Sequence, residues 1–127
     1  MIAIMSAFER LANLAGQERQ LAAGTLLFRN GDPVLSLFLV RAGEVRLVRM
    51  LPHGFELTLQ RAGSACVLAE ASLFAERYHC DAVAAEDSSL LAVPIANARA
   101  ALESDPALAC VLARHLAGEV QRTRTRA

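Results

Sequence analysis

The sequence has no excess of charge of either sign. Thirteen basic residues, all of them arginine, balance thirteen acidic residues over 127 positions, so the formal net charge is zero and the pI is about 6.8. A protein that binds nucleic acid on its own usually has a basic surplus or a basic stripe. The charge balance therefore argues against nucleic acid as a direct partner. With 54% hydrophobic residues the chain is too apolar for intrinsic disorder, and its length fits one domain.

Cysteine is also scarce. The three cysteines, Cys66, Cys80 and Cys110, are odd in number and show no CxxC spacing. This pattern argues against a disulfide scaffold, a zinc ribbon and a four-cysteine iron–sulfur site, so we expect no metal site. Reduced thiols of this kind are typical of a cytoplasmic protein, which is the location we expect.

Long apolar runs and catalytic motifs are missing as well. No stretch approaches the ~20 apolar residues that cross a bilayer. The apolar opening, residues 1–5, is followed by Glu9 and Arg10 before the core of a signal peptide could form. There is no nucleophile elbow, Walker loop, HExxH or GxGxxG motif. We therefore expect neither a membrane partner nor an enzyme.

Three zones of hydrophobic periodicity divide what we interpret as a single domain, residues 1–127. Helical spacing over residues 6–21 predicts an N-terminal helix. Residues 22–94 change to a period of two, with glycines every 7 to 12 residues, which is typical of an all-β sandwich or barrel. Residues 95–127 return to helical spacing. Four of the glycines are assigned to structural turns: Gly31, Gly43, Gly54 and Gly63.

Alternation within the central zone predicts individual strands and their faces. Residues 45–50 alternate between apolar side chains and arginine, with a slip near the end. Phe55, Leu57 and Leu59 alternate with polar residues. Each pattern predicts a strand with one buried apolar face and one wet face. Residues 37–40 are apolar on both faces, which favours a place in the middle of the fold.

The C-terminal zone predicts a short helix over 95–102 and a longer one that restarts at Asp105, just before Pro106. An apolar stripe recurs every four residues along the longer helix: Leu108, Leu112, Leu116 and Val120. The stripe must be buried against something. It could pack on the chain's own β-zone, and a helix that pairs two copies of the chain is the hypothesis we favour. The terminal arginines fit a solvated helix end, where the dipole favours cations.

Three segments carry a family resemblance: residues 21–33 (LAAGTLLFRNGDP), 37–45 (LFLVRAGEV) and 69–74 (AEASLF). With the order of the three zones, they resemble the cyclic-nucleotide-binding domain of the Crp/Fnr superfamily of bacterial transcription regulators. The resemblance implies a mainly β fold with flanking helices. Its core would be a double-stranded β-helix or jelly-roll β-roll that cradles an effector, with a long C-terminal dimerisation helix. DNA would be bound only through a helix-turn-helix domain that this sequence does not contain.

The resemblance also implies a ligand cassette. Glu70 matches the glutamate that binds the sugar hydroxyl of the nucleotide, and Ala71 and Ser72 fall in the short helix that faces the cyclic phosphate. Ala69 stands where the family has glycine, so the backbone is less open to a ligand. Thr123, on the long helix, falls where the family often contacts the base.

The family's phosphate-binding arginine has no counterpart in register. Arg77 lies two residues too early. His79 stands at the expected position, with Tyr78 or Cys80 as the less favoured registers. A neutral histidine does not replace a permanent cation at pH 7. We therefore expect an effector-sensing domain with a degenerate phosphate cassette and an unknown effector. A true cyclic AMP or cyclic GMP site, with Arg77 or His79 on the phosphate, is an alternative.

Two further alternatives stay open. A haem or redox sensor would take ligands from His79 with Cys66 or Cys80, although haem is the less favoured cofactor. Neighbouring residues on a strand point to opposite faces, so His79 and Cys80 are not expected to line one pocket. A ligand-free dimerisation module is the other alternative. His115 on the helix stripe suggests a pair across a dimer seam that responds to pH.

Overall fold

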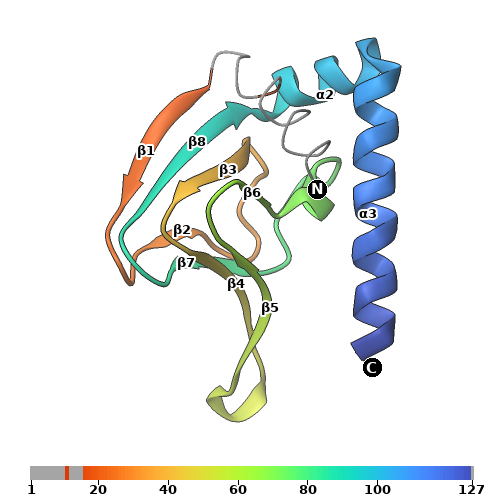
Figure 1. Ribbon diagram of the computed structural model, residues 1–127. Coiled ribbons are helices and arrows are strands. Elements are labelled where there is room, and N and C mark those ends of the chain that lie inside the picture. The colour runs from red at the N-terminus through yellow and green to blue at the C-terminus, as the bar shows by residue number, and fades with distance from the viewer. Residues whose placement is uncertain (1–10, 12–15, 127) are drawn as a thin grey trace.

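The computed structural model describes Leu11 and residues 16–126, with two four-stranded sheets and two α-helices beside them (Figure 1). The strands are β1 (Gln17–Leu21), β2 (Leu26–Phe28), β3 (Ser36–Ala42), β4 (Val45–Met50), β5 (Glu56–Ala62), β6 (Cys66–Leu68), β7 (Asp81–Ala84) and β8 (Ser88–Pro94). The helical elements are the short turns η1 (Pro52–Gly54) and η2 (Glu70–Ser72), then α2 (Ile95–Ser104) and α3 (Pro106–Arg126).

The strands form a jelly-roll β-roll, as predicted. One sheet has the order β1-β8-β3-β6 and the other β2-β7-β4-β5, with antiparallel pairing throughout. The chain crosses repeatedly between the two sheets, so their inner faces enclose one core. The segment predicted to be buried on both faces belongs to β3, which lies between β8 and β6. That prediction is confirmed.

The core between the sheets contains the single tyrosine of the chain. The ring of Tyr78 stacks on Phe28, with centroids 3.6 Å apart, and its hydroxyl donates to the carbonyl oxygen of Ser36 at 2.9 Å. Burial, with smaller contributions from Cys80 and Asp32, raises the pKa of Tyr78 to about 12. The phenol therefore stays protonated at neutral pH and acts as a hydrogen-bond donor inside the roll.

A second apolar layer joins the outer face of the first sheet to α2 and α3. Leu108 and Leu112 of α3 are buried in it, so the first half of α3 is fixed to the roll. The predicted restart of the helix is confirmed, because Asp105 Oδ1 accepts a hydrogen bond from the backbone N–H of Leu108 at 3.2 Å. Within the described part of the chain, no helix is long and apolar enough to span a membrane.

The helix predicted over residues 6–21 is wrong at its C-terminal end. Residues 17–21 form β1, an edge strand paired with β8, so the roll begins earlier than residue 22. The first four side chains of β1 are polar and exposed. Backbone pairing rather than apolar burial holds this strand, so it carries no alternation. Leu11 is helical and buried, and the rest of the predicted helix, residues 6–10 and 12–15, lies outside the described residues.

The β4–β5 hairpin projects from the roll (Figure 1), and the faces of β5 are the reverse of the prediction. Phe55, Leu57 and Leu59 are exposed over 68%, 44% and 39% of their surface. Thr58 and Gln60, on the opposite face, are half-buried. The apolar residues have no second sheet to cover them where the hairpin leaves the roll, and Gln60 turns inward because its amide is used inside the molecule.

The four predicted turn glycines all lie between strands. Gly31, Gly43 and Gly54 have φ values of 92°, 88° and 82°, and Gly63 lies in the connection between β5 and β6. Gly43 has the strictest requirement, because a Cβ atom there would lie 2.7 Å from the Cα atom of Ser88. This close approach joins the β3–β4 turn to the start of β8.

Candidate functional site

A cavity of about 530 Å³ lies between the roll and α3. We call it the α3 cavity. It is lined by β4, β5, η2, the segments next to η2 and before β7, and the helix α3, with these residues: Leu47, Arg49, Leu59, Gln60, Ala69, Glu70, Ala71, Ser72, Ala75, His79, Cys80, Leu116, Glu119, Val120, Thr123 and Arg124. Its volume fits a small organic ligand, and apolar walls with a few charged groups are typical of ligand pockets.

Both carboxylate oxygens of Glu70 are engaged in this cavity. Gln60 Nε2 donates to Oε1 at 3.2 Å, and His115 Nε2 lies 2.9 Å from Oε2. Because an ionised carboxylate can only accept, His115 donates through Nε2. The side chains of Glu70 and His115 are 10% and 16% exposed. The nearly buried carboxylate is therefore compensated by one partner from β5 and one from α3.

The Glu70–His115 pair joins η2 to α3 and corrects the prediction for His115. His115 was expected at a seam between two copies of the chain, but it faces the roll of its own chain. The reason is helical spacing, because His115 follows Leu108 and Leu112 by seven and three positions and shares the face that they bury. The pair is a direct polar link between the predicted cassette and the long helix.

The backbone that presents Glu70 is strained. Ala69 has φ 59° and ψ 38°, in the left-handed region, which costs a residue with a Cβ atom about 1–2 kcal/mol. The backbone N–H of Ala69 donates to Gln60 Oε1 at 3.2 Å, so Gln60 holds both the strained residue and the carboxylate. Beyond η2, Arg99 of α2 donates to the carbonyl oxygen of Leu73 at 2.8 Å. These contacts fix the segment on both sides of Glu70.

Most of the predicted cassette lies together. Ala71, Ser72, His79 and Thr123 line the α3 cavity with Glu70. The Thr123 hydroxyl donates to a backbone carbonyl of its own helix, at 2.9 Å, so its oxygen keeps acceptor capacity toward the cavity.

Arg77 is placed elsewhere. Its guanidinium Nη1 donates to the carbonyl oxygen of Gly31 at 2.8 Å, and its backbone forms a bridge with Pro33. It is not among the residues that line the α3 cavity. Arg77 therefore ties the segment before β7 to the turn after β2.

His79 and Cys80 both line the α3 cavity, against the expectation that they would point apart. Strand alternation does not apply to them, because β7 begins only at Asp81. Burial raises the pKa of the Cys80 thiol. The Arg49 guanidinium acts in the opposite direction, and Asp81 adds to the rise. The thiol is therefore protonated at neutral pH, which makes it a poor nucleophile.

The other predicted sulfur ligand lies apart from this site. Cys66 is exposed and does not line the α3 cavity, so His79 and Cys66 do not share it. Among the described residues, no group of three or more histidine, cysteine or acidic side chains is arranged to hold a metal ion.

Two arginines that the sequence did not single out line the α3 cavity. Arg49 Nη2 donates to the carbonyl oxygen of His79 at 3.2 Å, and Arg124 extends from the last turns of α3. In sequence, Arg49 looks like the wet face of a strand. Its role depends on the pairing of β4 with β7, where Val48 lies opposite Asp81. Local patterns do not reveal this pairing.

The apolar stripe of α3 divides between the core and the cavity. Leu108 and Leu112 are 4% and 6% exposed and pack on the roll, so they are not available to a second copy of the chain. Packing of these residues on the chain's own roll is the alternative that the sequence left open. Leu116 is partly buried and lines the cavity, and Val120 also lines it while 49% exposed.

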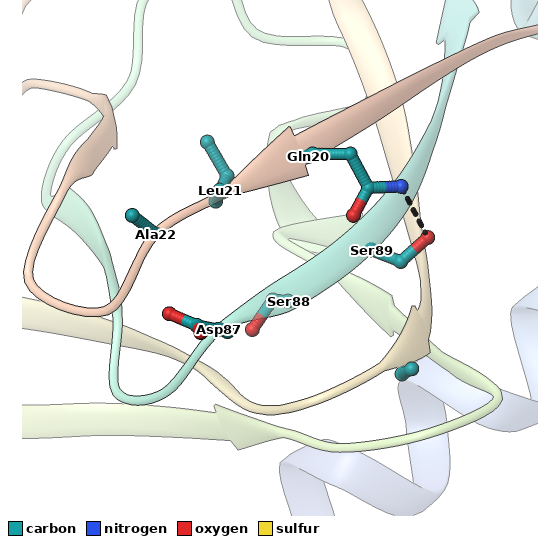
Figure 2. Close-up of a pocket in the computed structure, with 7 residues that line it drawn as sticks. Gln20, Leu21, Ala22, Asp87, Ser88 and Ser89 are labelled. Carbon is teal, nitrogen blue, oxygen red and sulfur yellow. Dashed lines mark hydrogen bonds between the residues drawn. The ribbon is translucent and has the colours of Figure 1, made fainter.

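A second cavity, of about 390 Å³, lies beside β1 and the start of β8 (Figure 2). Its polar groups bond to one another or to the backbone. Gln20 Nε2 donates to Ser89 Oγ at 3.2 Å, and Asp87 Oδ1 accepts from the backbone N–H of Ala23 at 2.9 Å. None of its described lining residues is cationic. The α3 cavity therefore has more groups available to bind a ligand than this second cavity has.

Comparison with known proteins matches residues 18–105 to the family model of the cyclic nucleotide-binding domain. No curated protein matches the chain in sequence.

Several solved structures share the fold and most of the chain. The catabolite activator protein of Thermus thermophilus aligns with a TM-score of 0.80 and 31% identity, over 95% of this chain and 57% of that one. The N-terminal domain of a transcriptional regulator from Streptomyces coelicolor has a TM-score of 0.69 and 31% identity, over 96% and 84%. The sensor domain of the transcriptional regulator DNR from Pseudomonas aeruginosa has the same fold at 22% identity, with a TM-score of 0.78 over 96% and 82%. This chain thus spans little more than half of the Thermus protein.

Proposed function

The chain belongs to the cyclic nucleotide-binding domain family, and from this premise we propose that it is the effector-sensing, dimerising domain of a Crp/Fnr-type transcription regulator. Its role is regulatory rather than catalytic, and it acts in the cytoplasm. DNA is contacted through a helix-turn-helix domain outside the 127 residues described by this sequence. The effector is a small molecule that occupies the α3 cavity.

The observation that carries this proposal is that one cavity is walled by both the roll and α3. Glu70 of η2 and His115 of α3 are hydrogen-bonded at 2.9 Å, and Leu116 and Thr123 of α3 line the same space as Glu70. A ligand there touches the roll and the helix together. It can shift the position of α3 by as much as it binds one arrangement more tightly than another.

A cyclic nucleotide is the first effector to test. The Glu70 carboxylate has lone pairs left to accept from a sugar hydroxyl, the leucine walls suit the face of a base, and Thr123 lines the same cavity with a hydroxyl oxygen that can accept a hydrogen bond. We propose that the phosphate cassette is degenerate, and the bond of Arg77 to the carbonyl oxygen of Gly31 supports this. A ligand-free dimerisation module is the second candidate. It is favoured because both carboxylate oxygens of Glu70 already have hydrogen-bond partners, Gln60 and His115.

The experiment is a thermal-shift titration with cyclic AMP and cyclic GMP, up to about millimolar. A ligand present at one hundred times its dissociation constant adds about 2.7 kcal/mol of stability. In a domain of this size that raises the midpoint by about 8–14 °C. Arg29→Gln, an exposed arginine outside the cavity, is the control for general ionic effects. A saturable rise supports effector sensing, and a flat response to both nucleotides favours the ligand-free module.

The homodimer is proposed to form through the α3 face that the roll leaves open. Cys110, Ala113 and Ala117 are exposed at helical spacing, beside the exposed side of Val120. Sedimentation at tens of micromolar should show a dimer, and Ala117→Glu should produce monomers that keep the circular dichroism of wild type. The unfolding midpoint of wild type should rise with protein concentration, and that of Ala117→Glu should not. A monomeric wild-type chain under these conditions would contradict dimerisation by this domain alone.

A further inference from the structure

Arg49 is a cation held at the wall of the α3 cavity. It comes from β4, and its Nη2 donates to the carbonyl oxygen of His79 at 3.2 Å. A guanidinium has five N–H donors, so this single bond fixes its direction and leaves the other donors for a ligand. At this position the backbone of β4 pairs with β5, where Arg49 lies opposite Leu57, and the pairing with β7 ends one residue earlier at Val48.

The Arg49 guanidinium has no ion-pair partner among the described residues. Four other arginines form ion pairs there: Arg41 with Glu18, Arg46 with Glu56, Arg61 with Glu44 and Arg122 with Glu119. Arg49 forms none with any carboxylate of residues 16–126.

The carboxylates of the cavity itself have other partners. Glu70 is bonded to His115 and Gln60, and Glu119 is paired with Arg122. The cavity therefore presents a guanidinium that no cavity carboxylate neutralises. Such a group favours an anion, because a planar fork can donate two parallel hydrogen bonds to phosphate oxygens.

We propose that Arg49 binds the phosphate of the effector and so determines that the α3 cavity takes a phosphorylated ligand. This rests on the proposed function in taking the α3 cavity as the effector site. The phosphate lies against Arg49 beside residues 79–80, at the end of the cavity where β4 meets the start of β7. The cation thus comes from β4, which no local sequence signal indicated.

Two other cationic or basic side chains line the cavity, and neither is placed as well. Arg49 and Arg124 are both exposed, but Arg124 has no hydrogen bond to the described residues that would orient it. His79 offers an imidazole ring, which lacks the guanidinium fork that donates two parallel hydrogen bonds to a phosphate. The hydrogen bond to the carbonyl oxygen of His79 orients the Arg49 guanidinium before a ligand arrives, which reduces the entropy lost on binding.

The test uses inorganic phosphate as a bare anion and compares it with chloride at equal ionic strength. Phosphate raises the midpoint of most proteins slightly by exclusion from their surface. The measured quantity is therefore the phosphate excess, which is the unfolding midpoint in phosphate minus the midpoint in chloride. It is compared between wild type and each variant. The variants are Arg49→Gln, Arg49→Lys, Arg124→Gln and the control Arg29→Gln, each with its circular dichroism checked against wild type.

We expect wild type, Arg29→Gln and Arg124→Gln to keep the phosphate excess, and Arg49→Gln to lose it. Arg49→Lys should retain part of the excess, because it keeps the charge and loses the fork. An equal phosphate effect in wild type and Arg49→Gln overturns the proposal. So does a loss in Arg124→Gln while Arg49→Gln keeps it.

A second arm titrates cyclic AMP and the uncharged nucleoside adenosine by calorimetry. Cyclic AMP should bind Arg49→Gln about 10- to 100-fold more weakly than wild type, with adenosine affected less than about twofold. Equal cyclic AMP affinity in both proteins overturns the role of Arg49 while the proposed function stands. If wild type binds no cyclic nucleotide but the phosphate excess depends on Arg49, the nucleotide fails as effector and the anion site stands.

Discussion

His115→Phe removes the polar link between α3 and η2 and keeps a ring of similar size. In wild type, His115 Nε2 lies 2.9 Å from Glu70 Oε2, and the two side chains are 16% and 10% exposed. The variant leaves Glu70 with Gln60 as its remaining side-chain partner among the described residues. The matched variant Glu70→Gln removes the charge and keeps the shape of the side chain.

The expected destabilisation follows from the burial of the pair. A hydrogen bond to a charged group contributes about 1.5–3 kcal/mol, and removing one partner of a fully buried ion pair costs about 3–5 kcal/mol. Because some solvent reaches both side chains, we expect His115→Phe to cost about 2–3 kcal/mol. In a domain of this size, that lowers the midpoint by about 6–15 °C. Glu70→Gln alone should cost about 1–2 kcal/mol.

The assay is urea unfolding followed by circular dichroism for wild type, His115→Phe, Glu70→Gln and the double variant. Once one partner is gone, changing the other has less to remove, so the double variant should be more stable than the sum of the single changes predicts. The coupling should be about 1–2 kcal/mol. A coupling below about 0.5 kcal/mol would refute the reasoning, because the pair would then be no better than an exposed surface contact.

Three further predictions concern single residues. The folded state holds the Tyr78 proton more tightly than the unfolded state, whose pKa is 10.0, so stability should fall by about 3 kcal/mol as the pH rises from about 10 to 12. The chain has one tyrosine and no tryptophan, so tyrosinate absorbance reports this titration directly, and a midpoint near 10 would contradict it. Burial raises the pKa of Cys80, and alkylation at neutral pH followed by mass spectrometry should modify Cys80 at least about tenfold more slowly than the exposed Cys66; equal rates would be inconsistent with a protonated, buried thiol. Ala65 is exposed at φ 65°, so Ala65→Gly should stabilise the chain by about 0.5–1 kcal/mol in urea unfolding, and a loss of stability would argue against that backbone conformation.

Strands with a clear alternation or a double-sided apolar run could be predicted, and so could the helix restart at Asp105. These are local patterns that do not depend on distant partners. β1 could not be predicted, because an exposed polar edge strand shows no hydrophobic periodicity. The helical spacing of the preceding residues was therefore continued into β1 by mistake. The faces of β5 could not be predicted either. Alternation shows that two faces differ, but not which one a projecting hairpin turns outward.

The candidate site was predictable where a contiguous segment carries it. Glu70 and its neighbours in the sequence were found from one short motif. The contact of Glu70 with His115 joins residues 45 positions apart, and nothing in the helix pattern distinguishes a histidine that faces the roll from one that faces a second copy. Arg49 was missed for a similar reason, since its position in the cavity comes from strand pairing.

The most direct test of an effector that joins the roll to α3 is hydrogen–deuterium exchange with and without saturating cyclic AMP. Residues 69–80 and 115–124 line the same cavity from opposite sides. We predict that backbone exchange slows in both segments together, while β1, which contributes no residue to the α3 cavity, changes little. Unchanged exchange in α3 under conditions where calorimetry shows saturation would contradict a ligand that contacts the roll and the helix at once.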